Sequence, residues 1–244
     1  MATKRTARSA AGAAPAGRGA APAPAPAVLP MIEAKTKLTD LAYDQIEEAI
    51  ITLRIPPGTP ISEQSLSDMT GIGRTPIREA IQRLAREHLV LVLPQRGVLV
   101  SEIDVGKQLR LLETRREIER LICRNAAKRA TEAERKAFAK LAQEFISASA
   151  KNDDVTFIRA DRDFNELCLK TARNEFAEGA MRLLHGLSRR FWFLHYKQAA
   201  DLPEMGRLHA AVALAISKGD IDGAGVALDR LLDNIEAFTR STVL

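Results

Sequence analysis

A tight turn at Gly71-Ile72-Gly73 constrains the fold more than any other feature of this sequence, because it joins two short segments that both have helical patterns. Ser62 is expected to cap the first segment, and glycine at position 71 tolerates the left-handed conformation that ends a helix. Thr75 is expected to cap the second segment, with Pro76 in the first helical position. The second segment has one apolar stripe at helical spacing: Ile77, Ala80, Ile81 and Leu84. These features predict two helices joined by a tight turn.

A further helix and a hairpin flank this unit. Apolar residues recur at helical spacing from residue 42 to Leu53, and Pro56-Pro57-Gly58 cannot continue a helix. Downstream, residues 89–100 (LVLVLPQRGVLV) contain two β-branched and leucine-rich runs joined by Pro94–Gly97, which predicts a β-hairpin. Helix, helix, turn, helix and hairpin in this order predict a winged helix-turn-helix.

Arginines gather at the start of the helix that follows the turn. Arg74 and Arg78 are placed to face base edges in a DNA major groove, where guanine O6 and N7 accept hydrogen bonds in a geometry that arginine can bridge. The free N–H groups beside Thr75 favour a phosphate. Arg96, at the hairpin tip, is placed as a wing residue that enters the minor groove or touches the DNA backbone. A single arginine on a helix is usually solvated surface, but turn and wing together favour DNA binding.

Residues 42–100 also carry a family resemblance. The stretch "AYDQIEEAIITLRIPPGTPISEQSLSDMTGIGRTPIREAIQRLAREHLVLVLPQRGVLV" resembles the N-terminal domain of GntR-family bacterial transcription regulators. The resemblance implies these DNA contacts: Gln64, Arg74, Thr75, Arg78, Arg96 and Gly97. Gln64 stands where many members have arginine in the second helix, and Gly73 where they have serine or threonine. These two departures leave the preferred operator sequence open.

The remaining chain is predicted to be helical. Between Pro94 and Pro203 there is no proline, and aliphatic residues recur three and four positions apart. The expected helices cover residues 104–129, 131–150, 154–172, 175–198, 204–218 and 221–240. Helices in this number predict an antiparallel bundle. Neither a glycine-rich phosphate loop nor a nucleophile with a base beside it is recognisable, which disfavours an enzyme.

This helical part is similar to the FCD-type C-terminal domain of the FadR subfamily. The stretches that carry the likeness are "RREIERLICRNAA", "DRDFNEL" and "LHAAVALAISKGDIDGAGVALDRLLDNI". The resemblance implies a helical bundle that holds a small molecule or a metal and mediates dimerisation. Many members bind the metal with one aspartate and three histidines.

Only part of that ligand set is present in this sequence. Asp161 and His209 fall on ligand positions, but Asn165 and Leu231 stand where the other two histidines are expected. Leucine cannot ligate a metal, and an amide oxygen is a poor ligand for zinc or nickel. We therefore expect no required cofactor. A zinc or nickel site remains the alternative, completed only if the helices bring in other histidines, namely His185 or His195.

Without a metal, the same positions can bind an organic acid. Asp161, Asn165 and His209 supply hydrogen-bonding groups, and Arg115 or Arg190 could clamp a carboxylate through two parallel hydrogen bonds. The segment "SRRFWFLHY" (residues 188–196) concentrates aromatic side chains in one helix. These rings pack either in the core or a dimer interface, or they line a pocket for an acid that is itself aromatic.

Composition adds limits on compartment and partners. The first 30 residues hold Lys4, Arg5, Arg8 and Arg18 and no acidic residue, so this tail contributes most of the net charge of +5, and net charge alone is weak evidence for a nucleic-acid partner. The two cysteines, Cys123 and Cys168, suggest neither a disulfide framework nor a thiolate zinc site. No apolar run approaches the roughly 18 residues needed to span a bilayer. A cytoplasmic protein without a membrane partner is expected.

These observations predict a mainly α protein in three parts. Residues 1–30 form a disordered basic tail, residues 31–102 a winged helix-turn-helix, and residues 103–244 a helical effector-binding and dimerisation domain. We expect a homodimeric repressor of a catabolic operon that binds a pseudo-palindromic operator in double-stranded DNA and senses a small carboxylated metabolite. The alternatives are a metal-dependent regulator, an enzyme built on the helical domain, and a non-specific DNA binder that uses the basic tail.

Overall fold

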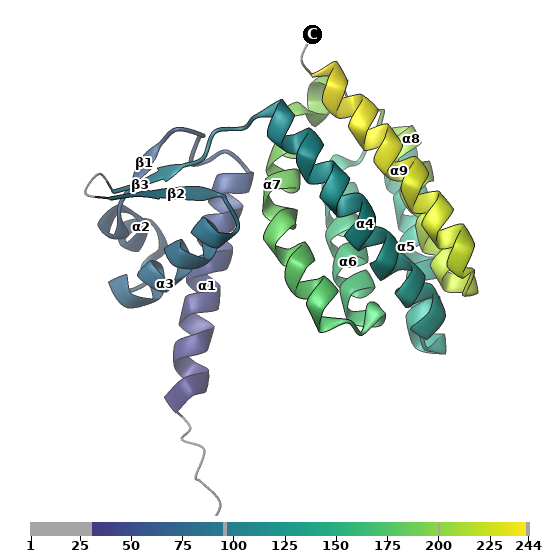
Figure 1. The fold of residues 1–244 in the computed structure, drawn as a ribbon, viewed down its shortest axis with the longest axis horizontal. Coiled ribbons are helices and arrows are strands. Elements are labelled where there is room, and N and C mark those ends of the chain that lie inside the picture. The colour runs from purple at the N-terminus through teal and green to yellow at the C-terminus, as the bar shows by residue number, and fades with distance from the viewer. Residues whose placement is uncertain (1–30, 95–96, 200, 243–244) are drawn as a thin grey trace, which may run out of the picture.

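In the N-terminal part, the helix that follows the tight turn packs against two other helices. The computed structural model describes residues 31–94, 97–199 and 201–242, so the expected tail and Arg96 lie outside the described residues. Helix α1 (Met31–Ile51) is followed by α2 (Glu63–Thr70) and α3 (Arg74–Arg86), as Figure 1 shows. Leu53, expected as the last apolar residue of the first helix, lies beyond α1 with φ 59°, because the chain has already turned towards the prolines.

The ends of α2 match the expected chemistry. The Ser62 side chain accepts a hydrogen bond from the Ser65 backbone N–H, and Gly71 takes the left-handed conformation (φ 70°) at the C-terminal end. The Gly71 N–H donates to the Ser67 carbonyl oxygen at 2.9 Å. A side chain at position 71 would be strained at this φ, so glycine permits the sharp turn into α3.

A small antiparallel sheet forms the wing. Strands β2 (Val90–Leu93) and β3 (Gly97–Val100) make the expected hairpin, with Val92 opposite Val98. A further strand, β1 (Pro60–Ile61), pairs with the other edge of β3 and gives the order β1-β3-β2. The sequence did not indicate β1, because a strand this short shows no periodicity.

The core of this part is built from one face of each element. The α3 stripe is buried as predicted, and it packs against apolar residues of α1, which include Ala42, Ile46 and Ile50. Leu89, between α3 and β2, is fully buried in the same cluster. The polar face of α3 is thereby turned outward.

The second part of the described chain is a bundle of long helices. Its elements are α4 (Val105–Arg129), α5 (Glu132–Ala150), α6 (Asp154–Ala172), α7 (Glu175–Ala199), α8 (Leu202–Lys218) and α9 (Ile221–Ser241). Helix α5 packs along α8, and α4 packs along α9. The chain thus combines an N-terminal winged helix-turn-helix with a C-terminal helical domain, as predicted. None of the described helices is both long and apolar enough to cross a bilayer.

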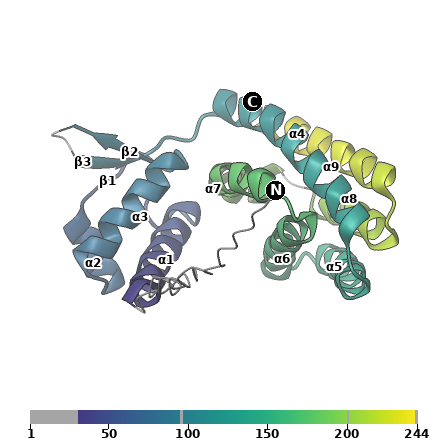
Figure 2. The ribbon, with the colours of Figure 1, turned by 60° about the horizontal axis from the view of Figure 1, so that its bottom comes forward.

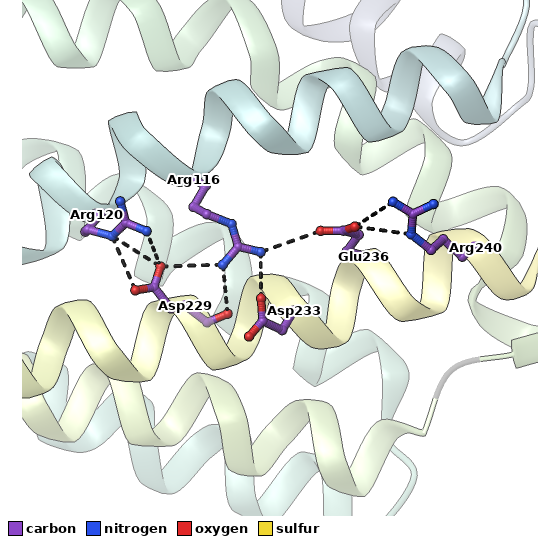
Figure 3. A network of polar contacts seen from close by, with 6 residues as sticks. All are labelled: Arg116, Arg120, Asp229, Asp233, Glu236 and Arg240. Carbon is purple, nitrogen blue, oxygen red and sulfur yellow. Dashed lines mark hydrogen bonds and ion pairs between the residues drawn. The ribbon is translucent and has the colours of Figure 1, made fainter.

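A ladder of ion pairs joins α4 to α9 on the outer side of the bundle (Figure 3). Arg116 Nη2 lies 2.8 Å from Asp233 Oδ1, and Arg120 Nη2 lies 2.7 Å from Asp229 Oδ1. Glu236 on α9 accepts from Arg240 of the same helix at 2.8 Å. The pairs fix the register between the first and the last helix of the domain.

Helix α7 occupies a special place between the two parts. Figure 2 shows α7 between α1 of the winged helix-turn-helix and α6 of the bundle, and α7 contacts α1 and α4 directly. The apolar side chain of Leu187 packs against the N-terminal core, whereas Met181 belongs to the core of the bundle. Helix α7 therefore belongs to both cores.

Candidate DNA-reading face and helical-domain cavity

The start of α3 is open to solvent. Gly73 is the N-cap, in extended conformation and with no side-chain hydrogen bond to the helix, and no acidic residue lies in the first turn. The prediction that Thr75 caps this helix with Pro76 in the first position is wrong, because the extended glycine lets the helix begin at Arg74. Thr75 is exposed in the first turn. The N–H groups of this turn remain available to an anion such as a phosphate.

The two arginines in the N-terminal half of α3 are held by side chains of α2. Arg78 donates two hydrogen bonds to Glu63, from Nε at 2.6 Å and from Nη2 at 2.8 Å. Arg74 donates to the amide oxygen of Gln64, and Gln64 in turn donates to Asp68 at 2.6 Å. The sequence did not indicate Glu63, because periodicity assigns a residue to a face but does not identify its partner.

This clamp sets the arginines in place without burying them. The Arg78 side chain is 64% exposed, and its hydrogen bond lowers the pKa of the Glu63 carboxyl below its usual value. An exposed pair of this kind is worth little in free energy, so guanine or phosphate can replace Glu63 as the acceptor. Glu63 therefore fixes the direction of the exposed Arg78 side chain.

The wing tip is described only in part. Gly97 begins β3 with φ 91°, opposite Leu93 at the end of β2. The positive φ explains why glycine stands at this position, since a side chain there would be strained. Arg96, which is predicted to contact DNA, lies outside the described residues.

A cavity of about 660 Å³ lies within the helical domain and extends to α1. Its volume falls in the range of small-molecule sites. The predicted site residues that line it are Arg115, Asp161, Asn165 and His209, and Leu231 is buried in the same wall. Four of the five predicted effector residues are thus brought to one cavity.

Asp161 and His209 form a polar pair in this cavity, in which His209 is buried and Asp161 is partly exposed. His209 Nδ1 lies 2.8 Å from the Met205 carbonyl oxygen, so this nitrogen donates, and Nε2 lies 3.3 Å from Asp161 Oδ1. Asn165 Nδ2 donates to the same oxygen at 3.1 Å. Although burial alone would raise it, the pKa of the Asp161 carboxyl is lowered by its contact with His209 and by the charge of Arg115. Asp161 is therefore held as a carboxylate.

Arg115 brings a guanidinium to the same cavity. Its Nε donates to Glu119 Oε1 at 2.6 Å, and its Nη1 donates to Ser188 Oγ. The Ser188 hydroxyl also accepts from Gln108 Nε2 at 3.1 Å. Among the described residues, Nη2 of Arg115 has no hydrogen-bond partner, so this nitrogen can donate to a ligand.

Arg190 does not reach the cavity, and its predicted role as a carboxylate clamp is wrong. Its side chain is 1% exposed and points to the connection between β3 and α4, where Nη1 donates to the Ser101 carbonyl oxygen at 2.9 Å. Nη2 donates to Ser101 Oγ at 3.0 Å and to the Glu102 carbonyl oxygen at 3.4 Å. Backbone acceptors next to the helical domain take up the charge instead of a ligand.

The aromatic segment of α7 contributes to both the core and the cavity. Phe191, Trp192 and Phe193 all line the cavity. Phe191 is buried, and the Trp192 ring lies 5.1 Å from the Phe238 ring of α9. The side chain of Tyr196 lies outside the described residues. Phe191 and Trp192 therefore pack against other side chains and also line the cavity, so the two interpretations, core packing and pocket lining, are compatible for these rings.

The donor set does not fit a closed metal site. No group of three or more histidine, cysteine, aspartate or glutamate side chains converges among the residues that the structure describes. His185 lines the cavity, but burial, assisted by the charge of Arg115, lowers its pKa to about 3. His195 instead packs against the Phe191 ring at 4.6 Å. Neither histidine completes the pair of Asp161 and His209.

Comparisons with known proteins agree in both parts of the chain. The family described as bacterial regulatory proteins, gntR family, matches residues 38–100, and the FCD domain matches residues 110–234. The transcriptional repressor RspR of Escherichia coli is 28% identical over 199 residues, which cover 81% of this chain and 87% of RspR. The transcriptional repressor NanR of Enterobacter is 26% identical, over 84% of this chain and 86% of NanR.

Solved structures show the same fold. Escherichia coli McbR/YncC superposes with a TM-score of 0.74 at 19% identity, covering 85% of this chain and 99% of that chain. A GntR regulator from Rhodococcus sp. RHA1 gives a TM-score of 0.62 at 22% identity, covering 84% and 98% of the two chains. At these identities the likeness concerns the fold alone.

Proposed function

This chain belongs to the FCD family and carries the DNA-binding domain of the bacterial gntR regulators, and from this premise we propose that it is a homodimeric repressor whose operator binding responds to a small organic acid. It is a DNA-binding transcriptional regulator and not an enzyme. Repressors are named among its relatives, which supports repression. We also propose that its target is a catabolic operon and that it acts in the cytoplasm, where DNA is found.

The exposed face of α2 and α3 is the proposed operator contact. Arg78 reads base edges, Arg74 and Gln64 contact bases or phosphate, and Thr75 lies beside the open N-terminal end of α3. Arg96 and Gly97 belong to the proposed wing contact. Because one α3 reads only a half-site, two copies related by a twofold axis fit a pseudo-palindromic operator.

The effector is proposed to be a carboxylic acid with an apolar or aromatic body. The observation that carries this proposal is the unpaired Nη2 of Arg115 in a cavity whose walls include Phe157, Phe164 and Trp192. A carboxylate can accept hydrogen bonds from that nitrogen, and the rings can cover the remainder of the molecule. Asp161 and His209 then offer an acceptor and an imidazole to any further polar group of the acid.

No metal is required in this proposal. One carboxylate and one imidazole cannot close the coordination of zinc or nickel, and buried Leu231 occupies a position that would have to supply a ligand. The purified protein is expected to contain substoichiometric metal by elemental analysis. Stoichiometric zinc or nickel, together with loss of operator binding after chelation, would favour the metal-dependent alternative.

A thermal-shift screen of organic acids tests the effector proposal. Benzoate and succinate represent aromatic and aliphatic acids, and an acid that binds only the folded state raises the melting temperature by mass action. The shift is expected to disappear in Arg115→Ala and to persist in Arg124→Ala, a surface arginine of the same helix that pairs with Asp222. An acid that shifts both variants equally binds elsewhere, and that result would contradict the Arg115 assignment.

Selection of binding sites from random duplexes tests the DNA proposal. We expect a pseudo-palindromic sequence and a complex that contains two copies of the chain, measured by light scattering. Recovery of random sequences, with binding abolished by mixed-sequence competitor, would favour the non-specific binder instead.

A further inference from the structure

Three consecutive residues of α7 contact three different parts of the molecule. Ser188 accepts hydrogen bonds from Gln108 and Arg115 inside the cavity. Arg189 forms ion pairs with α1, to Glu47 at 3.6 Å and to Glu48 at 3.5 Å. Since neighbours on a helix point in different directions, one turn of α7 faces the cavity and the winged helix-turn-helix simultaneously.

The third residue, Arg190, holds the connection between the two parts. Its hydrogen bonds to Ser101 and to the Glu102 carbonyl are described above, and burial lowers the pKa of its guanidinium to about 10. Ser101 Oγ donates in turn to the His88 carbonyl oxygen at 2.7 Å, and the Ser101 N–H donates to the Leu89 carbonyl oxygen at 3.0 Å. His88 and Leu89 follow Glu87, the C-cap of α3, so two hydrogen bonds connect Arg190 to the segment that leaves α3.

The surface of α1 that receives Arg189 is also tied to α3. Tyr43 Oη, one turn before Glu47, donates to Glu87 Oε2 at 2.6 Å. The Arg83 guanidinium of α3 stacks over the Tyr43 ring at 3.5 Å and pairs with Glu87 at 3.2 Å. A displacement of α1 or of the residues after α3 therefore also moves the C-terminal half of α3.

The backbone of α7 also touches the N-terminal core directly. A Cβ atom at Gly186 would lie 2.8 Å from Leu89 Cδ1, closer than side-chain contacts allow. Leu89 is 0% exposed, so it has no open space into which to move. Glycine at this position permits the close approach of α7 to the winged helix-turn-helix.

We propose that the turn of α7 at residues 185–190 relays occupancy of the cavity to the DNA-reading helix. The proposal rests on the proposed effector, which binds Nη2 of Arg115 beside the Nη1 that donates to Ser188, so a shift of the guanidinium towards the effector displaces Ser188. A change at Ser188 shifts the same rigid turn that carries Arg189 and Arg190. The effector then favours the relative position of the winged helix-turn-helix and the bundle in which its own contacts are most favourable. Operator affinity changes according to the difference in the effector's binding free energy between the two positions.

Gly186→Ala tests the relay without any ligand. The methyl group pushes α7 away from Leu89, and we expect operator affinity to fall about fivefold or more, within the usual range of coupling between sites. Gly179→Ala is the matched control, because it adds the same methyl group to the same helix with nothing within 4 Å. Its operator affinity is expected to stay within about twofold of the wild-type value, since only helix propensity changes.

A ligand-dependent pair of variants separates the relay from the effector proposal. Arg189→Ala is expected to keep the thermal shift with the acid probe but to lose at least half of the acid-induced change in operator affinity. Glu178→Ala is the control, because Glu178 of the same helix pairs with Arg182 of the helical domain and is not among the residues that line the cavity. It should respond as the wild type does.

The outcomes are distinguishable. If benzoate and succinate bind nowhere, the effector proposal loses its support, and the comparison of Gly186→Ala with Gly179→Ala alone decides the relay. If an acid binds and Arg189→Ala still responds fully, the relay is wrong while the effector proposal stands. Wild-type operator affinity in a folded Gly186→Ala protein would also overturn the relay. If Gly186→Ala does not fold, Arg189→Glu paired with Glu47→Lys replaces it, and restored coupling in the double variant supports the relay.

Discussion

The start of α3 and the middle of α7 both depend on arginines, but the two regions hold them in opposite ways. Arg74 and Arg78 are exposed and are aimed by side chains of the neighbouring helix α2. Arg190 is buried and donates to backbone oxygens of the connection between the two parts. An exposed arginine can exchange its partner for DNA, whereas a buried one is fixed because its charge has no other acceptor.

The largest expected effect follows from removing the buried arginine. Arg190→Ala leaves the Ser101 carbonyl without its donor and opens a cavity between the two parts. We expect the free energy of unfolding to fall by about 2–4 kcal/mol, measured by urea denaturation. Arg190→Lys keeps the charge but not the fork, so it should recover only part of the loss. Unchanged stability in Arg190→Ala would mean that the connection is held by other contacts.

Removing the exposed arginine should give the opposite pattern. Arg78→Ala is expected to weaken operator binding by about 1–3 kcal/mol and to relax sequence preference, while the free energy of unfolding stays constant. Gel-shift titrations on the selected operator measure the first effect, and urea denaturation measures the second. Arg86→Ala, an exposed arginine at the other end of α3, is the control and should bind within about twofold of wild type. Equal losses in both variants would indicate a general charge effect.

The same contrast between exposed and buried arginines explains which features could be predicted from the sequence. Helical spacing predicted the buried stripe of α3 and the helices of the bundle, because periodicity is a local property. The partner of Arg78 lies 15 residues away and that of Arg190 lies 89 residues away, so neither follows from a local pattern. For Arg78 the face was enough to indicate an exposed side chain. For Arg190, whose neighbours decide its role, the prediction of a ligand contact was wrong.

The cavity residues were predicted by resemblance to the FCD family, and the structure brings most of them together. Spacing along the chain could not show that Glu119 and Ser188 accept hydrogen bonds from Nε and Nη1 of Arg115, since Ser188 comes from another helix. Nor could it show that His209 donates to Met205 through Nδ1. The resemblance identified positions, whereas the chemistry of the cavity depends on how the helices pack.

As the pH falls, the residues of the cavity should lower the free energy of unfolding before the exposed face of α2 and α3 is affected. Burial lowers the pKa of His185 to about 3, below the usual 6.5, so the folded state binds fewer protons than the unfolded chain between these values. Stability from His185 is therefore full above pH 6.5 and is lost as pH falls towards 3, with a slope of up to about 1.4 kcal/mol per pH unit. The lowered pKa of Asp161 acts in the same direction at the acidic end. Urea denaturation at several pH values should show a smaller slope for His185→Gln, and an identical slope would contradict buried, neutral His185.

The smallest effect is expected for arginines that are partly or fully exposed on the helical domain and contact neither DNA nor the connection between the two parts. Arg120→Ala removes hydrogen bonds to both oxygens of Asp229 within the network of Figure 3, and we expect it to destabilise the fold by about 0.5–1 kcal/mol. Arg124→Ala removes one contact, to Asp222, whose side chain is 86% exposed, so about 0–0.5 kcal/mol is expected. In 1 M salt the difference between the two variants should shrink, because exposed charges are screened. A loss for Arg120→Ala as large as that for Arg190→Ala, or one that salt does not reduce, would show that burial does not separate these classes of arginine.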